Sequence, residues 1–252
     1  MRNDLDPGGG AGTGPPGSTA VSLARFAREA ERLGLHQDAG TAALAERVRL
    51  ITEPLTGDER ALDAGCGAGA LALALAPLVR EVVGVDLVPE LLEQARRRAP
   101  ANATFVEGNV EKLPFERGEF DLSGCMRVLH HVVRPELVLS ELGRVTRPGG
   151  HILVVDQLGA TDPLAQLERD RFDRTRDPSH QRSLPDADIR ALLEMNDLVV
   201  VRNEIGFEER ELESYLDRAG LSDEERERAA ALAPGPRWQV EVGWYLARKP
   251  GG

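Results

Sequence analysis

A glycine-rich segment between a predicted strand and a predicted helix carries the clearest chemical signal in the chain. In LDAGCGAG, residues 62–69, glycine occupies positions 65, 67 and 69. Glycine at such a turn permits a tight bend and lets backbone N–H groups approach a ligand without a Cβ in the way. The spacing is typical of a nucleotide-binding turn, with a purely structural glycine turn as the alternative.

Two carboxylates discriminate between the nucleotides that this turn could bind. Residues 65–70 also fit the loosened dinucleotide pattern G-x-G-x-x-G/A, so NAD must be considered. Asp63 precedes the first glycine, and its charge disfavours a pyrophosphate but favours an ammonium or sulfonium. Asp86 ends the next predicted strand, where it can accept both hydroxyl protons of an adenosine ribose; an N-cap of the following helix is the alternative. The pair favours a cationic nucleoside over NAD.

Three histidines are the candidates for general-base chemistry. His130 and His131 follow the fourth predicted strand, and His180 lies in a polar loop, residues 174–182. Histidine is the side chain whose ordinary pKa is nearest to physiological pH. The alternatives are a histidine that caps the next helix and, for His180, a solvated loop.

Further charged residues are predicted near these histidines. Arg127 follows the fourth strand, and Arg176 lies in the same loop as His180. Together with the histidines they would form a cationic, titratable set suited to an anionic or enolisable substrate. The alternative for Arg176 is a surface ion pair with Asp177, which would contribute little. Asp156, at the end of the fifth strand, points to the same edge and could orient a histidine.

Short apolar runs alternate with helical stretches from Arg60 onward. They predict strands at residues 61–63, 81–86, 104–107, 120–125, 151–156, 198–201 and 238–247. Alternation of strand and helix implies parallel strands with right-handed crossovers. We therefore expect an α/β fold, a Rossmann-like sheet of seven mostly parallel strands with helices on both faces and an antiparallel edge strand.

The rest of the chain is organised around this core. Residues 1–18, rich in Gly and Pro, are expected to be a disordered tail. Residues 19–252 then form a single domain: N-terminal helices and a helical lid at 19–54, the cofactor-binding core at 55–160, and a substrate-side loop, helices and last strands at 161–252. The charged stretch 207–232 is expected to be a solvated helical face, with a cover over the substrate mouth or a homodimer contact as alternatives.

Composition limits the partners. The chain has 252 residues and a net charge of −11, which repels phosphate backbones and anionic lipid, so neither nucleic acid nor a membrane surface is expected as the main partner. Two cysteines are too few for a disulfide scaffold and typical of a reduced compartment. The longest apolar run, 70–79, is too short to span a bilayer. We expect a cytoplasmic protein without a metal site.

Six motifs in a fixed order resemble the class I S-adenosylmethionine-dependent methyltransferases. They are LDAGCGAG at 62–69, VD at 85–86, GNVEKLPF at 108–115, FDL at 120–122, HHV at 130–132 and RPGG at 147–150. Within that family the chain looks most like the small-molecule branch around the ubiquinone and menaquinone biosynthesis methyltransferases, known as methyltransferase type 11. The segment 176–180 also resembles one found in members of this branch.

The resemblance implies roles for individual residues. Asp63, Gly65 and Gly67 would line the methionine end of the cofactor, and Asp86 would hold the ribose. The other cofactor positions are Cys66 in the turn, expected to pack rather than to act as a nucleophile, Leu87 against the adenine, Asn109 and Val110 at the adenine edge, and Cys125 and Met126 beside the methyl group.

Two positions depart from the family pattern. Asn109 stands where the family usually has Asp, so an acceptor oxygen is kept and the charge is lost. In the first helix Phe26 and Ala30 match the pattern, but Leu33 stands in place of a Tyr that closes over the site, so no hydroxyl is available there.

These observations predict transfer of a methyl group from S-adenosylmethionine to a small organic acceptor, with S-adenosylhomocysteine as the second product. The resemblance suggests an aromatic, quinone-like or natural-product acceptor. The reaction is an in-line displacement in which the protein excludes water and holds the nucleophile about 3–3.5 Å from the methyl carbon. The alternatives are a protein of this fold that uses S-adenosylmethionine for another reaction, an NAD-dependent reductase and a non-enzymatic binding module.

Overall fold

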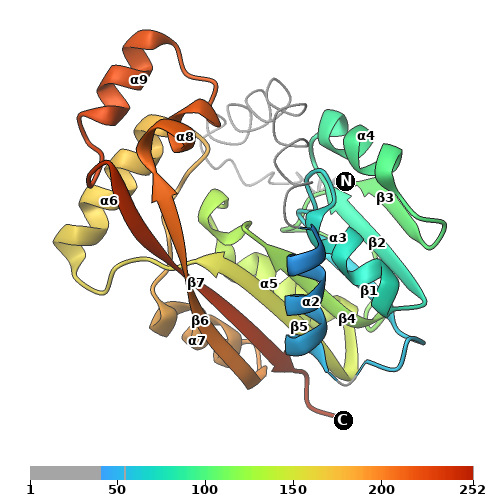
Figure 1. Cartoon of the computed structure of the whole chain (residues 1–252). Coiled ribbons are helices and arrows are strands. Elements are labelled where there is room, and N and C mark those ends of the chain that lie inside the picture. Colours follow the sequence, from blue (N-terminus) through green and yellow to red (C-terminus); the bar gives the residue numbers. More distant parts are fainter. Residues whose placement is uncertain (1–40, 54, 252) are drawn as a thin grey trace, which may run out of the picture.

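Seven strands form one sheet in the computed structural model, which describes residues 41–53 and 55–251. Their order across the sheet is β3-β2-β1-β4-β5-β7-β6 (Figure 1). The strands are β1 (Arg60–Ala64), β2 (Glu81–Asp86), β3 (Ala103–Glu107), β4 (Phe120–Met126), β5 (Thr146–Gln157), β6 (Val199–Glu211) and β7 (Arg237–Arg248). Neighbours among β1 to β5 are parallel, whereas β7 runs antiparallel to both β5 and β6. The predicted α/β fold is confirmed.

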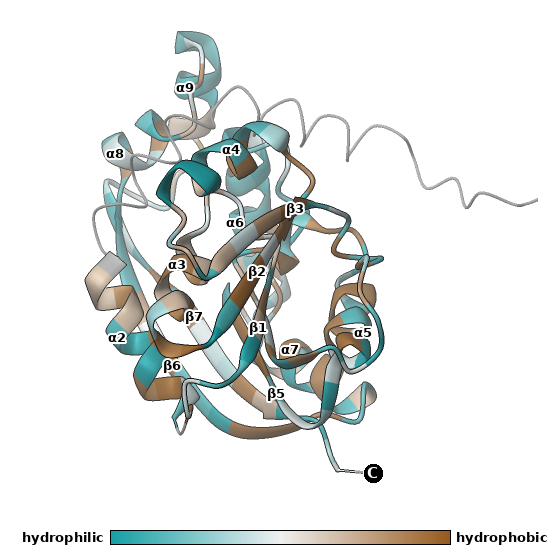
Figure 2. Ribbon diagram, turned by 90° about the vertical axis from the view of Figure 1, so that its right-hand side faces the viewer, coloured by the Kyte–Doolittle hydropathy of each residue, from teal (hydrophilic) through white to brown (hydrophobic). Residues whose placement is uncertain are grey.

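Helices cover both faces of this sheet. Three lie on one face, α2 (Thr41–Thr52), α3 (Ala70–Leu75) and α4 (Pro89–Arg98), and two on the other, α5 (Pro135–Val145) and α7 (Asp186–Met195). Each face has its own apolar core, with Val48, Leu71 and Leu92 on the first and Leu139 and Ile189 on the second. Figure 2 shows hydrophobic residues running through β2 and β3 and largely hydrophilic residues on α4 and α9.

Two helix starts follow directly from the sequence. Pro89 and Pro135 occupy the first turns of α4 and α5, where a missing N–H costs no hydrogen bond. The predicted helix at 89–98 is found with those bounds. Because β1 to β5 are parallel, their carboxyl ends, with the predicted site residues, meet at one edge of the sheet.

The last two strands differ most from the prediction. Phe207 to Glu211, predicted within a helical stretch, belong to β6 and pair with residues 237–241 of β7. Charged residues are compatible with either a helix or a strand, and the cross-strand partner decides here. In this part of β6, Glu208 and Arg210 turn inward while Phe207 and Glu209 are exposed. The strand therefore carries two charged side chains toward the interior.

A small third core lies where β6 ends and β7 begins. It is formed around Phe172, Tyr215 and Trp238, which come from α6 (Pro163–Arg176), α8 (Leu212–Asp217) and β7. The helix α9 (Asp223–Ala230) adds Ala229. Figure 1 shows α6, α8 and α9 gathered at the upper end of β6 and β7, away from the helices that cover the sheet.

Some predictions fall outside the described residues. They are the tail at 1–18 and the first helix with Phe26, Ala30 and Leu33. Within the part of the chain that the structure describes, no helix has the length and apolar character needed to cross a membrane.

Candidate functional site

The glycine-rich turn between β1 and α3 is held by backbone bonds to the neighbouring strand. The amides of Gly65 and Cys66 donate to the Val85 carbonyl at 2.7 and 2.9 Å. Gly65, Gly67 and Gly69 have φ angles of +75°, +52° and +92°, values that residues with a Cβ rarely adopt. The turn therefore needs glycine at these positions to keep its shape.

The space around two of these glycines differs. A Cβ on Gly65 would lie 2.5 Å from Cγ2 of Val128, so this glycine is required by packing. A Cβ on Gly67 would meet nothing closer than Cδ1 of Leu91 at 4.0 Å. The open side of the turn at Gly67 is thus a place that a ligand can fill, as an adenosyl cofactor would require.

Asp86, at the end of β2, faces this open side. Its Oδ2 accepts from the Gly67 amide at 2.8 Å, and its Oδ1 accepts from the Val88 amide at 2.9 Å. Burial raises the pKa of Asp86 despite these bonds. Each carboxylate oxygen can accept a further bond, so the turn-stabilising role and the predicted ribose contact are compatible.

Asp63 lies deeper than the sequence suggests. Its side chain is buried, and Oδ2 accepts from the Ala72 amide of α3 at 2.8 Å. Burial raises the pKa of Asp63 to about 7; the bond from Ala72 opposes the rise, and the charge of Asp86 adds to it. Asp63 can therefore act on a cofactor through its charge and by holding α3 to the turn.

The remaining predicted cofactor residues divide by exposure. Leu87, Met126 and Asn109 have exposed surface, and Asn109 Oδ1 accepts from the Glu111 amide at 2.8 Å. Val110, Cys66 and Cys125 are buried. Cys125 is fully buried, and burial raises the pKa of its thiol well above the ordinary value. The pKa of the Cys66 thiol is raised for the same reason, as fits a packing residue.

The three predicted histidines come together at the carboxyl edge of the sheet. The ring of His130 lies 4.1 Å from that of His131 and 5.6 Å from that of His180, between ring centroids. His130 and His131 lie in the short 3₁₀ turn η2 (Leu129–His131) after β4, and His180 follows α6. We call these three residues the histidine cluster.

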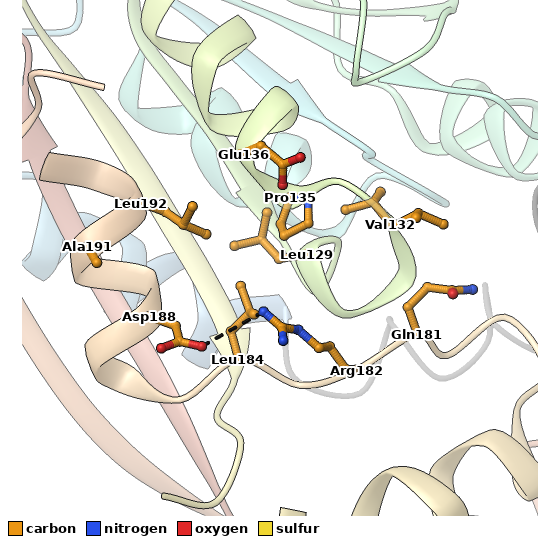
Figure 3. A pocket seen from close by; sticks show the side chains of 11 residues that line it. Leu129, Val132, Pro135, Glu136, Gln181, Arg182, Leu184, Asp188, Ala191 and Leu192 are labelled. Carbon is orange, nitrogen blue, oxygen red and sulfur yellow. Dashed lines mark ion pairs between the residues drawn. The ribbon is translucent and has the colours of Figure 1, made fainter. Parts of the chain in front are cut away.

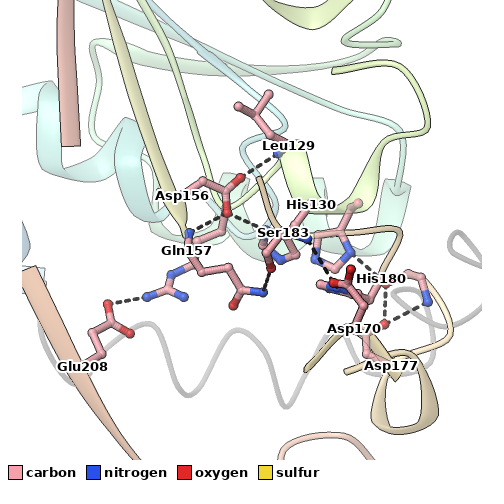
Figure 4. Close-up of polar contacts among 12 residues, drawn as sticks. Leu129, His130, Asp156, Gln157, Asp170, Asp177, His180, Ser183 and Glu208 are labelled. Atoms are coloured by element: carbon pink, nitrogen blue, oxygen red, sulfur yellow. Dashed lines mark hydrogen bonds and ion pairs between the residues drawn. The ribbon is translucent and has the colours of Figure 1, made fainter. Parts of the chain in front are cut away.

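Asp156 orients the first member of the histidine cluster. Its Oδ1 lies 2.5 Å from Nδ1 of His130, and its Oδ2 accepts from the Leu129 amide at 2.7 Å (Figure 4). Burial raises the pKa of Asp156, but the contacts with His130 outweigh it and the net pKa is lowered. An ionised carboxylate can only accept, so Nδ1 carries the hydrogen and Nε2 is the nitrogen that can take up a proton.

Ser179 orients the second member. Its hydroxyl donates to Oδ1 of Asp177 and so accepts from Nδ1 of His131, at 3.0 Å. Burial, together with the neighbouring His130, lowers the pKa of His131. His131 is therefore neutral near pH 7, with its Nδ1 hydrogen directed to Ser179.

Asp170 of α6 orients the third member. Its Oδ1 accepts from Nε2 of His180 at 2.9 Å and from the Ser183 amide at 3.2 Å. His180 is buried, so the alternative of a solvated loop is wrong. The Gln181 amide donates to the His130 carbonyl at 2.8 Å and ties this loop to η2. Within the described residues no His, Cys, Asp or Glu cluster has a metal-binding arrangement.

A family model described as "Methyltransferase domain" matches residues 62–154, from β1 to β5. The uncharacterized methyltransferase YcgJ of Bacillus subtilis is 32% identical over 179 residues, which cover 69% of this chain and 70% of YcgJ. The chain belongs to the S-adenosylmethionine-dependent methyltransferases. The assignment of Gly67 and Asp86 to the cofactor stays a prediction.

Two further comparisons show how far the likeness extends. The crystal structure of the proposed methyltransferase BH2331 from Bacillus halodurans is 25% identical and has a TM-score of 0.77, over 83% of this chain and 99% of that chain. The ubiquinone biosynthesis O-methyltransferase of Xanthomonas oryzae is 36% identical over 99 residues, 38% of this chain and 41% of that protein. This methyltransferase therefore shares less than half of that relative's length.

Several residues of the candidate site carry no local sequence signal. Asp170 and Glu208 reach the site from α6 and β6, far along the chain from His130. Asp177 and Ser179 belong to the segment 176–180, whose resemblance to other family members was the one available indication. Arg176 and Asp177 do not form a surface pair: both side chains are largely buried, with 3.6 Å between Nη2 and Oδ2.

A pocket of about 420 Å³ lies beside the histidine cluster. Leu129 and Gln181, the chain neighbours of His130 and His180, line it together with residues of α5 and α7 (Figure 3). Arg182 and Asp188 form an ion pair at 3.8 Å in its wall. None of the predicted cofactor residues lines this pocket, so it is separate from the methyltransferase's glycine turn.

Proposed function

We propose that this methyltransferase transfers the methyl group of S-adenosylmethionine to a small organic acceptor that loses a proton to the histidine cluster. The observation that carries the proposal is the contact between His130 and Asp156, after the ends of two neighbouring strands. Val128, two residues before His130, lies against Gly65 of the turn. The acceptor is a phenol, an enol or an amine, because these nucleophiles gain from a general base.

The residues of the turn fit the cofactor. Gly67 leaves open space, and Asp86 offers carboxylate oxygens that ribose hydroxyls require. Asp63 adds negative charge beneath the turn, which stabilises a cation more than a neutral group. When bound, S-adenosylmethionine supplies a methyl group on a positively charged sulfur.

His130 is the base in this proposal. Asp156 holds Nδ1 as a donor, so Nε2 of His130 can take the acceptor's proton as the acceptor bonds to the methyl carbon and the carbon–sulfur bond breaks, which would leave S-adenosylhomocysteine. Asp156 then stabilises the imidazolium, as a buried carboxylate partner does. His131 and His180 pack against the His130 ring and fix its orientation through Ser179 and Asp170.

The test uses the full chain, methyl-labelled S-adenosylmethionine and a panel of phenols, enols and amines. Formation of S-adenosylhomocysteine together with a labelled product supports the proposal. Binding of S-adenosylmethionine without its conversion across all three classes would overturn methyl transfer and favour another reaction of the same cofactor. A thermal shift with NADH and none with S-adenosylmethionine would instead favour a reductase.

A further inference from the structure

Four arginines from distant parts of the chain gather near the histidine cluster. Arg127 follows β4, Arg176 ends α6, Arg210 lies near the end of β6 and Arg218 follows α8. The guanidinium carbons of the last three lie 4.0, 5.6 and 5.7 Å from the ring centroid of Tyr215. We call these four residues the arginine cluster. Such a concentration is unexpected in a chain with a net charge of −11.

One carboxylate serves two members of the arginine cluster. Glu208 pairs with Arg127 through Oε1 and with Arg210 through Oε2, the latter at 2.6 Å. Burial raises the pKa of Glu208, but these two arginines outweigh it and lower the pKa overall, so Glu208 is ionised. Two guanidinium groups and one carboxylate leave this triad with a net positive charge.

The positive charge around Arg210 and Arg218 is incompletely balanced. Arg218 is half-buried, and burial followed by Arg210 lowers its pKa, so the guanidinium groups repel one another. Arg210 is 9% exposed at its side chain, and its buried Nε has no hydrogen-bond partner among the described residues. A buried donor without an acceptor is unfavourable, and an anion bound at the cluster would relieve both effects.

The arginine cluster lies beside the proposed base. Arg127 precedes His130 by three residues and has a φ of +59°, a strained value for a residue with a side chain. Asp177 also connects the two clusters, because it contacts Arg176 and Ser179, and Ser179 is the partner of His131. Figure 4 shows Glu208 on the opposite side of Asp156 from His180.

We propose that the arginine cluster binds an oxyanion of the methyl acceptor, a carboxylate or a phosphate, and so directs the acceptor's nucleophile toward His130. This inference rests on the proposed function, and it specifies the substrate as a small organic acid or phosphate. Guanidinium groups suit such ligands because they donate paired N–H bonds to planar or tetrahedral oxyanions.

The first experiment measures binding without chemistry. The ring centroid of Trp238 lies 5.4 Å from that of Tyr215, around which three arginines of the cluster lie, so the fluorescence of Trp238 reports on the arginine cluster. The full chain with bound S-adenosylhomocysteine is titrated with benzoate, phenyl phosphate and the neutral benzamide at constant ionic strength. We expect saturation with at least one anion and none with benzamide, and the preferred anion distinguishes carboxylate from phosphate. Equal binding of benzamide, or no binding of either anion, overturns the inference.

Variants assign the binding to the cluster. Arg218→Gln and Arg210→Gln should raise the dissociation constant at least about tenfold. Arg147→Gln, an exposed arginine paired with Asp121 at the opposite end of β4, is the matched control and should leave the dissociation constant unchanged. Arg218 is the less buried of the two, so its variant keeps the test valid if Arg210→Gln does not fold. Unchanged affinity in Arg218→Gln would overturn the inference.

The second experiment separates the two proposals. Methyl transfer is compared between hydroxybenzoic acids and their neutral methyl esters. Faster turnover of the acids, reduced by Arg218→Gln, supports both proposals. Faster turnover of the esters leaves methyl transfer standing and overturns the anion site. Anion binding without any turnover supports the site and counts against methyl transfer.

Discussion

Nδ1 of His130 and Oδ1 of Asp156 lie 2.5 Å apart, although 26 residues separate them along the chain. β4 and β5 are neighbouring parallel strands, and both residues lie at their carboxyl ends. The contact is therefore a consequence of sheet topology. It also fixes the imidazole tautomer, since the ionised Asp156 can only accept a hydrogen bond.

Asp156→Asn should reduce turnover while cofactor binding is retained. The amide can donate to Nδ1 and so stabilise the wrong tautomer, which removes the basic nitrogen from the acceptor. General-base contributions suggest a loss in kcat of about 10²- to 10⁴-fold. Steady-state kinetics and calorimetry with S-adenosylhomocysteine measure the two effects separately.

Asp121→Asn is a suitable control for that variant. Like Asp156, Asp121 is a carboxylate on a parallel strand, but it lies near the start of β4 and contacts Arg60 and Arg147 there. The Asp121→Asn substitution should leave kcat unchanged. If Asp156→Asn retained full turnover, the assignment of His130 as the base would be wrong.

Gly65→Ala should mainly lower stability, whereas Gly67→Ala should mainly weaken cofactor binding. A Cβ at Gly65 clashes with Val128 at 2.5 Å, so Gly65→Ala should lower the melting temperature strongly. A Cβ at Gly67 meets open space, and its positive φ costs about 1–2 kcal/mol, so Gly67→Ala should fold but bind S-adenosylmethionine more weakly. Thermal unfolding with and without the cofactor tests both. A normal cofactor-induced shift in Gly67→Ala would count against the placement of the cofactor at this turn.

Binding of S-adenosylmethionine should strengthen as pH rises from 6 to 8. The pKa of Asp63 is about 7, raised by burial and then by Asp86, so the charge that attracts a sulfonium appears across this range. We expect an affinity gain of about threefold to tenfold for S-adenosylmethionine and a smaller one for S-adenosylhomocysteine, which has no sulfonium. Calorimetry at pH 6, 7 and 8 decides, and identical pH profiles for the two ligands would contradict the role of Asp63.

The raised pKa of Asp63 should also make the folded protein less stable as pH rises, whereas it strengthens cofactor binding. Because the folded-state pKa of Asp63 lies above the unfolded one, the folded chain holds the proton more tightly between about pH 4 and 7. The contribution of Asp63 to the free energy of unfolding is therefore lost as pH rises through 7. Asp63→Asn should flatten this slope in urea unfolding.

Local sequence was sufficient for much of the fold and part of the site. Gly65, Gly67 and Asp86 could be predicted because the turn and the strand end are contiguous in sequence with the elements that position them. The three histidines could be predicted to form one set with nearby arginines, but the contacts between their rings could not, since these depend on where α6 and the loop after it pack.

Asp156 was predicted as a partner for a histidine, but the partners of His131 and His180 could not be predicted. Asp170 lies in α6 and His180 in the loop that follows this helix. No spacing rule predicts a contact between a helix residue and a residue of the following loop. Glu208 and Arg210 were expected on a helical face, whereas pairing with β7 makes the segment a strand and turns both side chains inward. Tertiary pairing overrides local propensity there.

Ser179→Ala should impair turnover by misorienting His131. The Ser179 hydroxyl accepts from Nδ1 of His131 and donates to Asp177, so its removal frees the imidazole and leaves Asp177 short of a donor. We expect kcat to fall about tenfold with unchanged affinity for S-adenosylhomocysteine, and Ser179→Thr to restore most of it because the hydroxyl is retained. The NMR shifts of the His131 ring nitrogens should change in the alanine variant and return in the threonine variant. If Ser179→Thr lost as much turnover as Ser179→Ala while both remained folded, the size of the side chain rather than its hydroxyl would decide turnover. The hydrogen bonds from His131 through Ser179 to Asp177 would then have no part in the reaction.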